Sequence, residues 1–154
     1  MNPTAPAPPL SPCSVTALRK ASRRVTQLYD TALAPAGLRS TQHAILSELN
    51  RRASAPPTLQ ALADALVMDR SALGHTLRPL ERDGLIGLQP GTHDRRQRYV
   101  VLTAAGAEKY REARSLWSAA QRRFQRVFGE GEARALRETL LAIANDERLA
   151  TLED

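Results

Sequence analysis

Arginine supplies most of the side chains in this sequence that could do chemistry, and its chemistry is the binding of anions. The chain has 154 residues, 22 basic against 16 acidic, and a net charge of +6. All the basic residues are arginine except Lys20 and Lys109. A planar guanidinium makes paired hydrogen bonds to phosphate or guanine. The composition therefore favours an acidic partner such as nucleic acid.

Groups suited to catalysis or to metal binding are sparse. His43, His75 and His93 are far apart in the sequence, and the single cysteine, Cys13, can form neither an internal disulfide nor a zinc cluster by itself. The sequence shows no glycine-rich phosphate loop, nucleophile elbow or catalytic dyad. We therefore expect a protein that is not an enzyme and that uses no cofactor and no metal.

The hydropathy pattern excludes a membrane-spanning helix. No stretch approaches the roughly 18 consecutive apolar residues of a membrane span. The proline-rich first residues lack the charged and apolar regions of a secretion signal, so we expect the cytoplasm as the location. Residues 1–13 are expected to form a disordered arm.

One group of arginines belongs to a helix that we expect from about residue 70 to residue 82. At about 100° per residue, Leu73, Leu77 and Leu80 share one apolar face. The opposite face is polar and without a carboxylate: Ser71, His75, Arg78 and Arg82. We expect Arg70, Ser71, His75 and Arg78 to contact bases in a major groove and Arg82 to meet phosphate.

A second group of arginines lies at a polar tip, residues 93–98, between two short apolar strands. Arg95 and Arg98 suit the narrow minor groove of DNA, where the negative potential is strongest. Asp94 is expected to hold the shape of this tip as an internal partner for Arg96. The alternative for both groups is a solvated surface with ion pairs, but their adjacency favours nucleic acid.

Apolar residues at helical spacing predict six helices and one two-stranded hairpin around these groups. The first begins at Ser14 and stops at Pro35 and Gly37, and Ser40 or Thr41 is expected to cap the second. A short third helix follows Thr58, and residues 67–69 form a turn into the fourth, which ends at Gly84. The strands lie near residues 85–88 and 99–102, with a turn that begins at Pro90.

The C-terminal third of the chain is expected to be helical. Thr103 can cap a long fifth helix that ends at Gly129, and a sixth helix continues weakly toward Leu149 and Leu152. The order of short helix, three-residue turn, second helix and hairpin is that of a winged helix-turn-helix. The fold class is therefore mainly α, with additional N- and C-terminal helices.

Two segments of the sequence resemble the multiple-antibiotic-resistance regulator (MarR) family of bacterial transcription factors. They are LADALVMDRSALGHTLRPLERDGLI, from Leu62 to Ile86, and DRRQRYVVLTAAG, from Asp94 to Gly106. The second contains the family's wing pattern of Asp-x-Arg followed by an apolar strand that ends in Leu-Thr. The first two helices resemble those of the family more loosely.

The resemblance implies a homodimeric transcriptional repressor. Residues 39–103 would form the DNA-binding domain, and residues 14–38 and 104–154 the helical dimerisation body. Two domains would bind half-sites of a pseudo-palindrome, about one helical turn apart. A small phenolic or other lipophilic effector would bind between body and domain, and Tyr29, His43 and Trp117 are the candidate lining residues. His43 has the alternative of an ordinary position in the second helix.

The apolar residues of the last two helices favour dimerisation independently of any resemblance. A single small winged domain cannot cover all of these large side chains. They are Trp117, Phe124, Phe128, Leu136 and Leu140.

Cys13 offers an alternative form of regulation. One branch of the family senses oxidants through a cysteine in the first helix, but its position corresponds to Val15 here. Tyr29 matches one tyrosine that supports the reactive thiol, and Ser40 stands at the position of the second. The alternatives are thus a redox switch at Cys13, an incidental cysteine, and, for the whole protein, a winged-helix interaction protein that no longer binds DNA.

Overall fold

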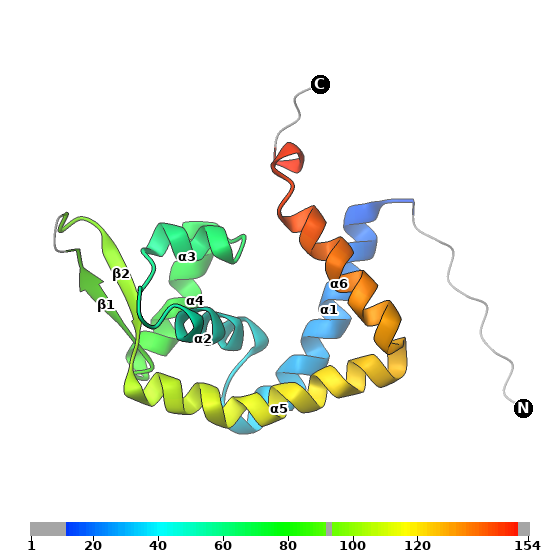
Figure 1. The fold of residues 1–154 in the computed structure, drawn as a ribbon, viewed down its shortest axis with the longest axis horizontal. Coiled ribbons are helices and arrows are strands. Elements are labelled where there is room, and N and C mark those ends of the chain that lie inside the picture. Colours follow the sequence, from blue (N-terminus) through cyan, green and yellow to red (C-terminus); the bar gives the residue numbers. More distant parts are fainter. Residues whose placement is uncertain (1–11, 92–93, 151–154) are drawn as a thin grey trace, which may run out of the picture.

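Six α-helices and one two-stranded sheet form the computed structural model, which describes residues 12–91 and 94–150 (Figure 1). In chain order the elements are α1 (Ser14–Leu33), the 3-10 turn η1 (Ala34–Ala36), α2 (Ser40–Arg51), α3 (Leu59–Ala65), α4 (Arg70–Arg82), β1 (Ile86–Pro90), β2 (Arg98–Leu102), α5 (Ala104–Phe128), α6 (Glu130–Ala144) and the 3-10 turn η2 (Glu147–Leu149). The mainly α winged helix-turn-helix class is confirmed. The expected disordered arm falls outside the described residues except for residues 12 and 13.

Local capping begins three of the helices. The side chains of Thr58, Asp69 and Thr103 accept hydrogen bonds from backbone N–H groups in the first turns of α3, α4 and α5. These contacts satisfy donors that the helix itself leaves unpaired. The predicted cap at Thr103 is confirmed, and Gly84, with φ of 72°, ends the segment after α4 as predicted.

The predicted cap of α2 is wrong. Ser40 is already the first helical residue, and its backbone N–H donates to Oδ1 of Asp30, 2.7 Å away. The N–H of Arg39 donates to Oε1 of Gln42 at 2.9 Å. The N–H of Ser40 is therefore satisfied from α1 and that of Arg39 from within α2, and the bond to Asp30 joins the two helices across η1.

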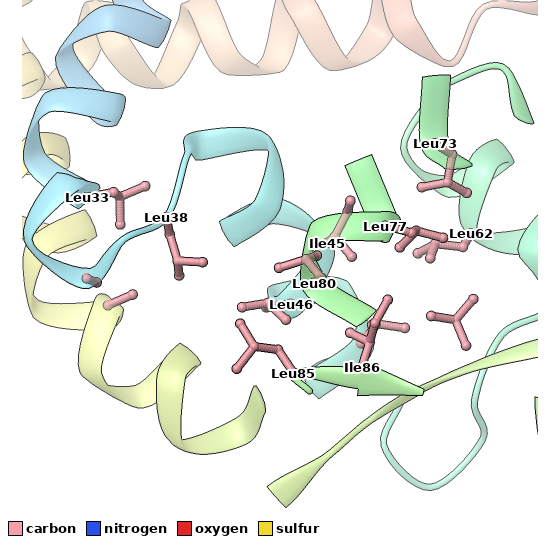
Figure 2. Packing of buried hydrophobic residues seen from close by; sticks show 14 of the residues in the cluster. Leu33, Leu38, Ile45, Leu46, Leu62, Leu73, Leu77, Leu80, Leu85 and Ile86 are labelled. Atoms are coloured by element: carbon pink, nitrogen blue, oxygen red, sulfur yellow. The ribbon is translucent and has the colours of Figure 1, made fainter. Parts of the chain in front are cut away.

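The hydrophobic core fills the space between α2, α3, α4 and the hairpin, and it reaches the end of α1 (Figure 2). The predicted apolar face of α4 is buried in it, as Leu73, Leu77 and Leu80 are at most 3% exposed. Burial of a leucine side chain contributes roughly 2 kcal/mol. The core therefore fixes which face of α4 is turned to solvent.

The two strands form an antiparallel hairpin in which Ile86 pairs with Leu102 and Pro90 with Arg98. The prediction of a turn from Pro90 is therefore wrong, because Pro90 is the last residue of β1. The N–H of Val100 donates to the carbonyl of Pro57 at 2.9 Å, outside the hairpin. This bond attaches the hairpin to the segment before α3.

The long helix α5 leads away from the hairpin to α6 and packs against α1 (Figure 1). The buried small residues Ala113 and Ala120 allow close packing along it. The predicted continuation of the sixth helix is wrong up to Leu149, because α6 ends at Ala144 and η2 is a separate turn. Leu152 lies outside the described residues.

Candidate nucleic-acid interface and ligand pocket

The outer face of α4 presents the polar residues that the sequence predicts. Opposite the buried leucines, four side chains are exposed: Ser71, His75, Arg78 and Arg82. Glu81 and Asp83 lie off the outer face near the end of the helix. Arg70, in the first turn, is exposed as well. This surface offers hydrogen-bond donors and positive charge to a partner.

Arg82 differs from the other exposed residues of α4 because its guanidinium pairs with a carboxylate of the same chain. Its Nε lies 3.0 Å from Oδ1 of Asp83, and both side chains are largely exposed. An exposed ion pair of this kind contributes only about 0–1 kcal/mol. A phosphate can therefore replace Asp83 at little cost, and the phosphate contact of Arg82 stays a prediction.

The tip between the strands is held by Asp94, although not through the group that the sequence suggests. Oδ1 of Asp94 accepts a hydrogen bond from the backbone N–H of Arg96 at 2.9 Å, an Asx turn. The carbonyl of Asp94 packs against Gly91, where an added Cβ would lie 2.5 Å from the carbonyl oxygen. Asp94 thus orders the backbone and leaves the guanidinium of Arg96 available.

The structure brings Arg70 close to two arginines of the hairpin, which sequence spacing could not reveal. A hollow of about 160 Å³ lies between the start of α4 and the hairpin. Its lining residues are Thr58, Leu59, Gln60, Arg70, Arg96, Gln97 and Arg98. Among residues 12–91 and 94–150, no carboxylate pairs with any of these three arginines. Arg95 is exposed outside the hollow.

The three candidate pocket residues Tyr29, His43 and Trp117 do come together. They line a cavity of about 340 Å³ between α2 and α5, with Tyr29 contributed by α1. Ring stacking organises one wall, since the rings of His43 and Trp117 are 5.9 Å apart and 11° from parallel. The cavity has further lining residues that the sequence pattern did not indicate: Ser47, Glu48, Leu66, Tyr110 and Arg114.

His43 is buried and has an unsatisfied nitrogen. Its side chain is 6% exposed, and Nε2 has no hydrogen-bond partner among the described residues. Tyr110 covers the ring at a centroid distance of 5.4 Å. Burial lowers the pKa of His43 below its usual value, because the charged form would lose its hydration. The imidazole is therefore neutral at pH 7.

Cys13 is exposed at the residue that precedes α1. Hydrogen bonding to Thr16 lowers the pKa of its thiol, which increases the thiolate fraction. The hydroxyl of Tyr29, however, donates to Gln121 of α5. The hydroxyl of Tyr29 therefore already has a hydrogen-bond partner in α5.

The described residues contain neither a grouped metal-binding set nor a helix suited to span a membrane. Within residues 12–91 and 94–150, no three or more histidine, cysteine or acidic residues are grouped to hold a metal ion. In the same part of the chain, no helix combines the length and the apolar character needed to cross a membrane.

Comparison with known proteins places this geometry among transcriptional regulators. Residues 38–97 match the model of the MarR family. No curated protein sequence matches the chain significantly. The fold is similar to that of the transcriptional regulator MosR of M. tuberculosis in complex with DNA, with a TM-score of 0.80 and 28% identity over 91% of this chain and 99% of that chain.

Two structures of CouR are similar as well. The transcriptional repressor CouR bound to a 23-mer DNA duplex has a TM-score of 0.77 and 25% identity, covering 86% of this chain and 93% of that chain. CouR of Rhodococcus jostii RHA1 bound to p-coumaroyl-CoA has a TM-score of 0.75 and 22% identity, covering 90% and 96%. The second likeness concerns the fold alone.

Proposed function

We propose that this chain, a DNA-binding transcriptional regulator that carries a MarR-family domain at residues 38–97, works as a homodimeric repressor released by a small effector. The observation that supports this most strongly is the exposed outer face of α4 beside an arginine-bearing hairpin. The α4 helix and the hairpin pack on the same hydrophobic core, so both can contact one DNA duplex at the same time. A DNA target also agrees with the cytoplasm as the site of action.

DNA recognition is assigned to residues of both elements. Arg70, Ser71, His75 and Arg78 would contact the major groove, Arg82 a phosphate, and Arg95 and Arg98 the minor groove. The domain would span residues 39–103. MosR and CouR, whose similar structures contain DNA, support this assignment.

Dimerisation would use residues 14–38 and 104–154. An apolar groove of about 550 Å³ lies between α1, α5 and α6 and includes Leu18, Val25, Phe124, Leu136 and Leu140. Several large apolar side chains of the same helices are exposed, among them Phe128 at 48% and Leu141 at 61%. A second copy of the chain would cover both and would place two α4 helices on one face of the duplex.

The effector would occupy the cavity between α2 and α5. Its stacked His43 and Trp117 rings suit an aromatic ligand. The guanidinium of Arg114 is exposed at its edge, and no ion pair to a described carboxylate engages it. A lipophilic aromatic anion fits this combination. Because the cavity joins the DNA-binding domain to the body, its occupation would change the half-site spacing of the dimer.

Selection of bound fragments from random duplex DNA, followed by footprinting, tests the function. We expect a pseudo-palindrome with half-sites about one helical turn apart. Replacing Arg95 and Arg98 together by alanine should weaken binding, and replacing the exposed Arg122 should not. Failure of the wild-type protein to select any DNA would favour a winged-helix interaction protein instead.

Trp117, the single tryptophan of the chain, reports on the cavity directly. Aromatic carboxylates such as hydroxycinnamates should quench its fluorescence and release bound DNA. Arg114→Ala should weaken both effects, whereas Arg122→Ala should leave them unchanged. Quenching that is identical in Arg114→Ala would contradict an anionic effector.

Oxidation of Cys13 is a second candidate for the releasing signal, favoured by the exposure and the lowered pKa of the thiol. The bond of Tyr29 to Gln121 argues against the arrangement of the redox branch. Organic hydroperoxide should release DNA from the wild type and not from Cys13→Ser if this signal operates. Equal release in both proteins excludes it.

A further inference from the structure

Two aromatic residues separate the groove assigned to dimerisation from the cavity assigned to the effector. Tyr29 of α1 and Trp117 of α5 line both the groove of about 550 Å³ and the cavity of about 340 Å³, and no other described residue lines both. Their ring centroids lie 6.3 Å apart, and the rings are inclined by 51°. We call these two rings the shared wall, because each of them faces both hollows.

The shared wall is supported on its cavity side only. There the Trp117 ring stacks on the buried His43, with centroids 5.9 Å apart. On the groove side the hydroxyl of Tyr29 donates to Gln121, but Trp117 remains 36% exposed. An aromatic ring that is open on one side lacks the van der Waals contacts that would hold it in place. A single chain therefore leaves the wall unsupported from the groove.

A second copy of the chain is the occupant that fits the groove. The groove is mostly apolar, and α1 and α6 lie side by side along it (Figure 1). Residues 14–29 of α1 contain no acidic residue and expose Arg19 and Arg23. The first turn of α6 instead exposes Glu130 and Glu132. Within residues 12–91 and 94–150, none of these four side chains has an ion-pair partner. A two-fold axis at the groove would bring α1 of one copy against α6 of the other, so that these opposite charges meet.

We propose that the second copy, by filling the groove, supports the shared wall and completes the effector cavity, so that the dimer binds the effector more tightly than the single chain does. The inference rests on the function proposed above and adds the dependence of ligand binding on assembly. A ligand that stacks on a ring already held in place loses less conformational freedom on binding. The effector meets such a preorganised wall only in the dimer.

Thermodynamic linkage makes this coupling reciprocal. If dimerisation strengthens effector binding, the effector strengthens dimerisation by the same factor at each cavity. DNA is then released by a changed half-site spacing in an intact dimer, and not by separation of the two copies.

The ligand affinity of a monomeric variant is the first test. Leu136 lines the groove but not the cavity, so Leu136→Glu removes the second copy without changing a ligand contact. Isothermal titration calorimetry with 4-hydroxycinnamate should give a dissociation constant about tenfold higher for folded Leu136→Glu than for the wild type. The dimeric control Glu138→Gln should bind like the wild type. Equal affinity in the wild type and in a folded, monomeric Leu136→Glu would overturn the proposal.

The dimer dissociation constant in the presence of ligand is an independent test. Fluorescence-detected sedimentation velocity measures this constant in a dilution series, with and without saturating 4-hydroxycinnamate. Leu140→Ala, which also changes the groove and not the cavity, weakens the dimer enough to measure if the wild type does not dissociate on dilution. With a tenfold factor at each of two cavities, the ligand should lower the constant by about a hundredfold. A constant that the ligand leaves unchanged or raises would overturn the proposal.

The outcomes separate this inference from the function on which it rests. A wild-type protein that binds no aromatic carboxylate would defeat the proposed effector. A folded Leu136→Glu protein that remains dimeric would defeat the proposed interface. A monomer that binds the ligand as tightly as the dimer, with both of those expectations met, would defeat this inference alone.

Discussion

His43 shows how one side chain can be shared by stability and by ligand binding. It is buried between Tyr110 and Trp117 and lines the cavity proposed for the effector. An unsatisfied buried nitrogen costs roughly 1–3 kcal/mol. A polar residue at this position therefore lowers stability unless a hydrogen-bond partner enters the cavity.

The lowered pKa of His43 makes stability depend on pH. The unfolded chain binds a proton near pH 6.5 while the folded protein resists it. Unfolding therefore takes up a proton. The stability contributed by neutral His43 is fully present above about pH 6.5, and it is lost as the pH falls toward the lower pKa of the folded state. We predict that urea denaturation of the wild type gives a lower free energy of unfolding at pH 5 than at pH 7.5.

Substitution of His43 isolates this effect. His43→Phe keeps an aromatic ring and should lose most of the pH dependence between these two values. The exposed His75 provides the matched control, and His75→Gln should behave like the wild type. Equal pH dependence in the wild type and in His43→Phe would show that His43 is not the titrating group.

The sequence pattern was enough to predict which arginines of α4 are exposed, but not which residues lie near Arg96. Periodicity places Ser71, His75 and Arg78 opposite buried leucines, because one helix determines all their directions. The approach of Arg70 to Arg96 depends on how the hairpin packs against the start of α3, which sequence spacing does not contain.

At the scale of elements, the turn between α3 and α4 holds an unfavourable conformation. Val67 has φ of 50° and is 65% exposed. A β-branched residue in the left-handed region costs roughly 1–2 kcal/mol. The turn nevertheless has to be this tight, because Met68 and Asp69 lead directly into α4.

We predict that Val67→Gly stabilises the protein. Glycine adopts this conformation without steric strain, and its greater freedom in the unfolded chain offsets part of the gain. The net effect should be about 0.5–1 kcal/mol, a rise in Tm of about 2 °C for a chain of this size. Thermal unfolding followed by circular dichroism measures it.

Ala135→Gly, at an exposed position of α6, is the control for this prediction. There glycine should destabilise by about 1 kcal/mol because the backbone is helical. A loss of stability in both variants would contradict strain at Val67.

Helix boundaries were predictable where the capping group is local and not where it is distant. Thr58, Asp69 and Thr103 each bond within three residues, so the sequence contains the signal. In the first turn of α2, the backbone N–H of Ser40 instead donates to the carboxylate of Asp30, which lies ten residues earlier in α1. Packing of α1 against α2 decides that boundary.

At the scale of the whole molecule, the proposed repressor consists of two copies of the chain. We predict that Leu136→Glu, which introduces a charge into the groove between α1, α5 and α6, gives a predominantly monomeric protein at micromolar concentration. Burial of an unpaired carboxylate opposes association strongly. Sedimentation velocity measures the state, and DNA affinity should fall with it.

Glu138→Gln, on the exposed surface of α6, is the control and should leave the dimer intact. Circular dichroism must show native helix content in Leu136→Glu, so that loss of the dimer is not a result of unfolding. A folded Leu136→Glu protein that remains dimeric would contradict this groove as the interface.

The most direct test of the whole account is a footprint of the wild-type protein on its selected DNA beside that of the Arg95→Ala, Arg98→Ala double variant. We predict two protected major-groove segments about one helical turn apart, flanked by minor-groove protection that the double variant lacks. A single protected segment, or protection that is identical in the two proteins, would contradict a paired grip by α4 and the hairpin.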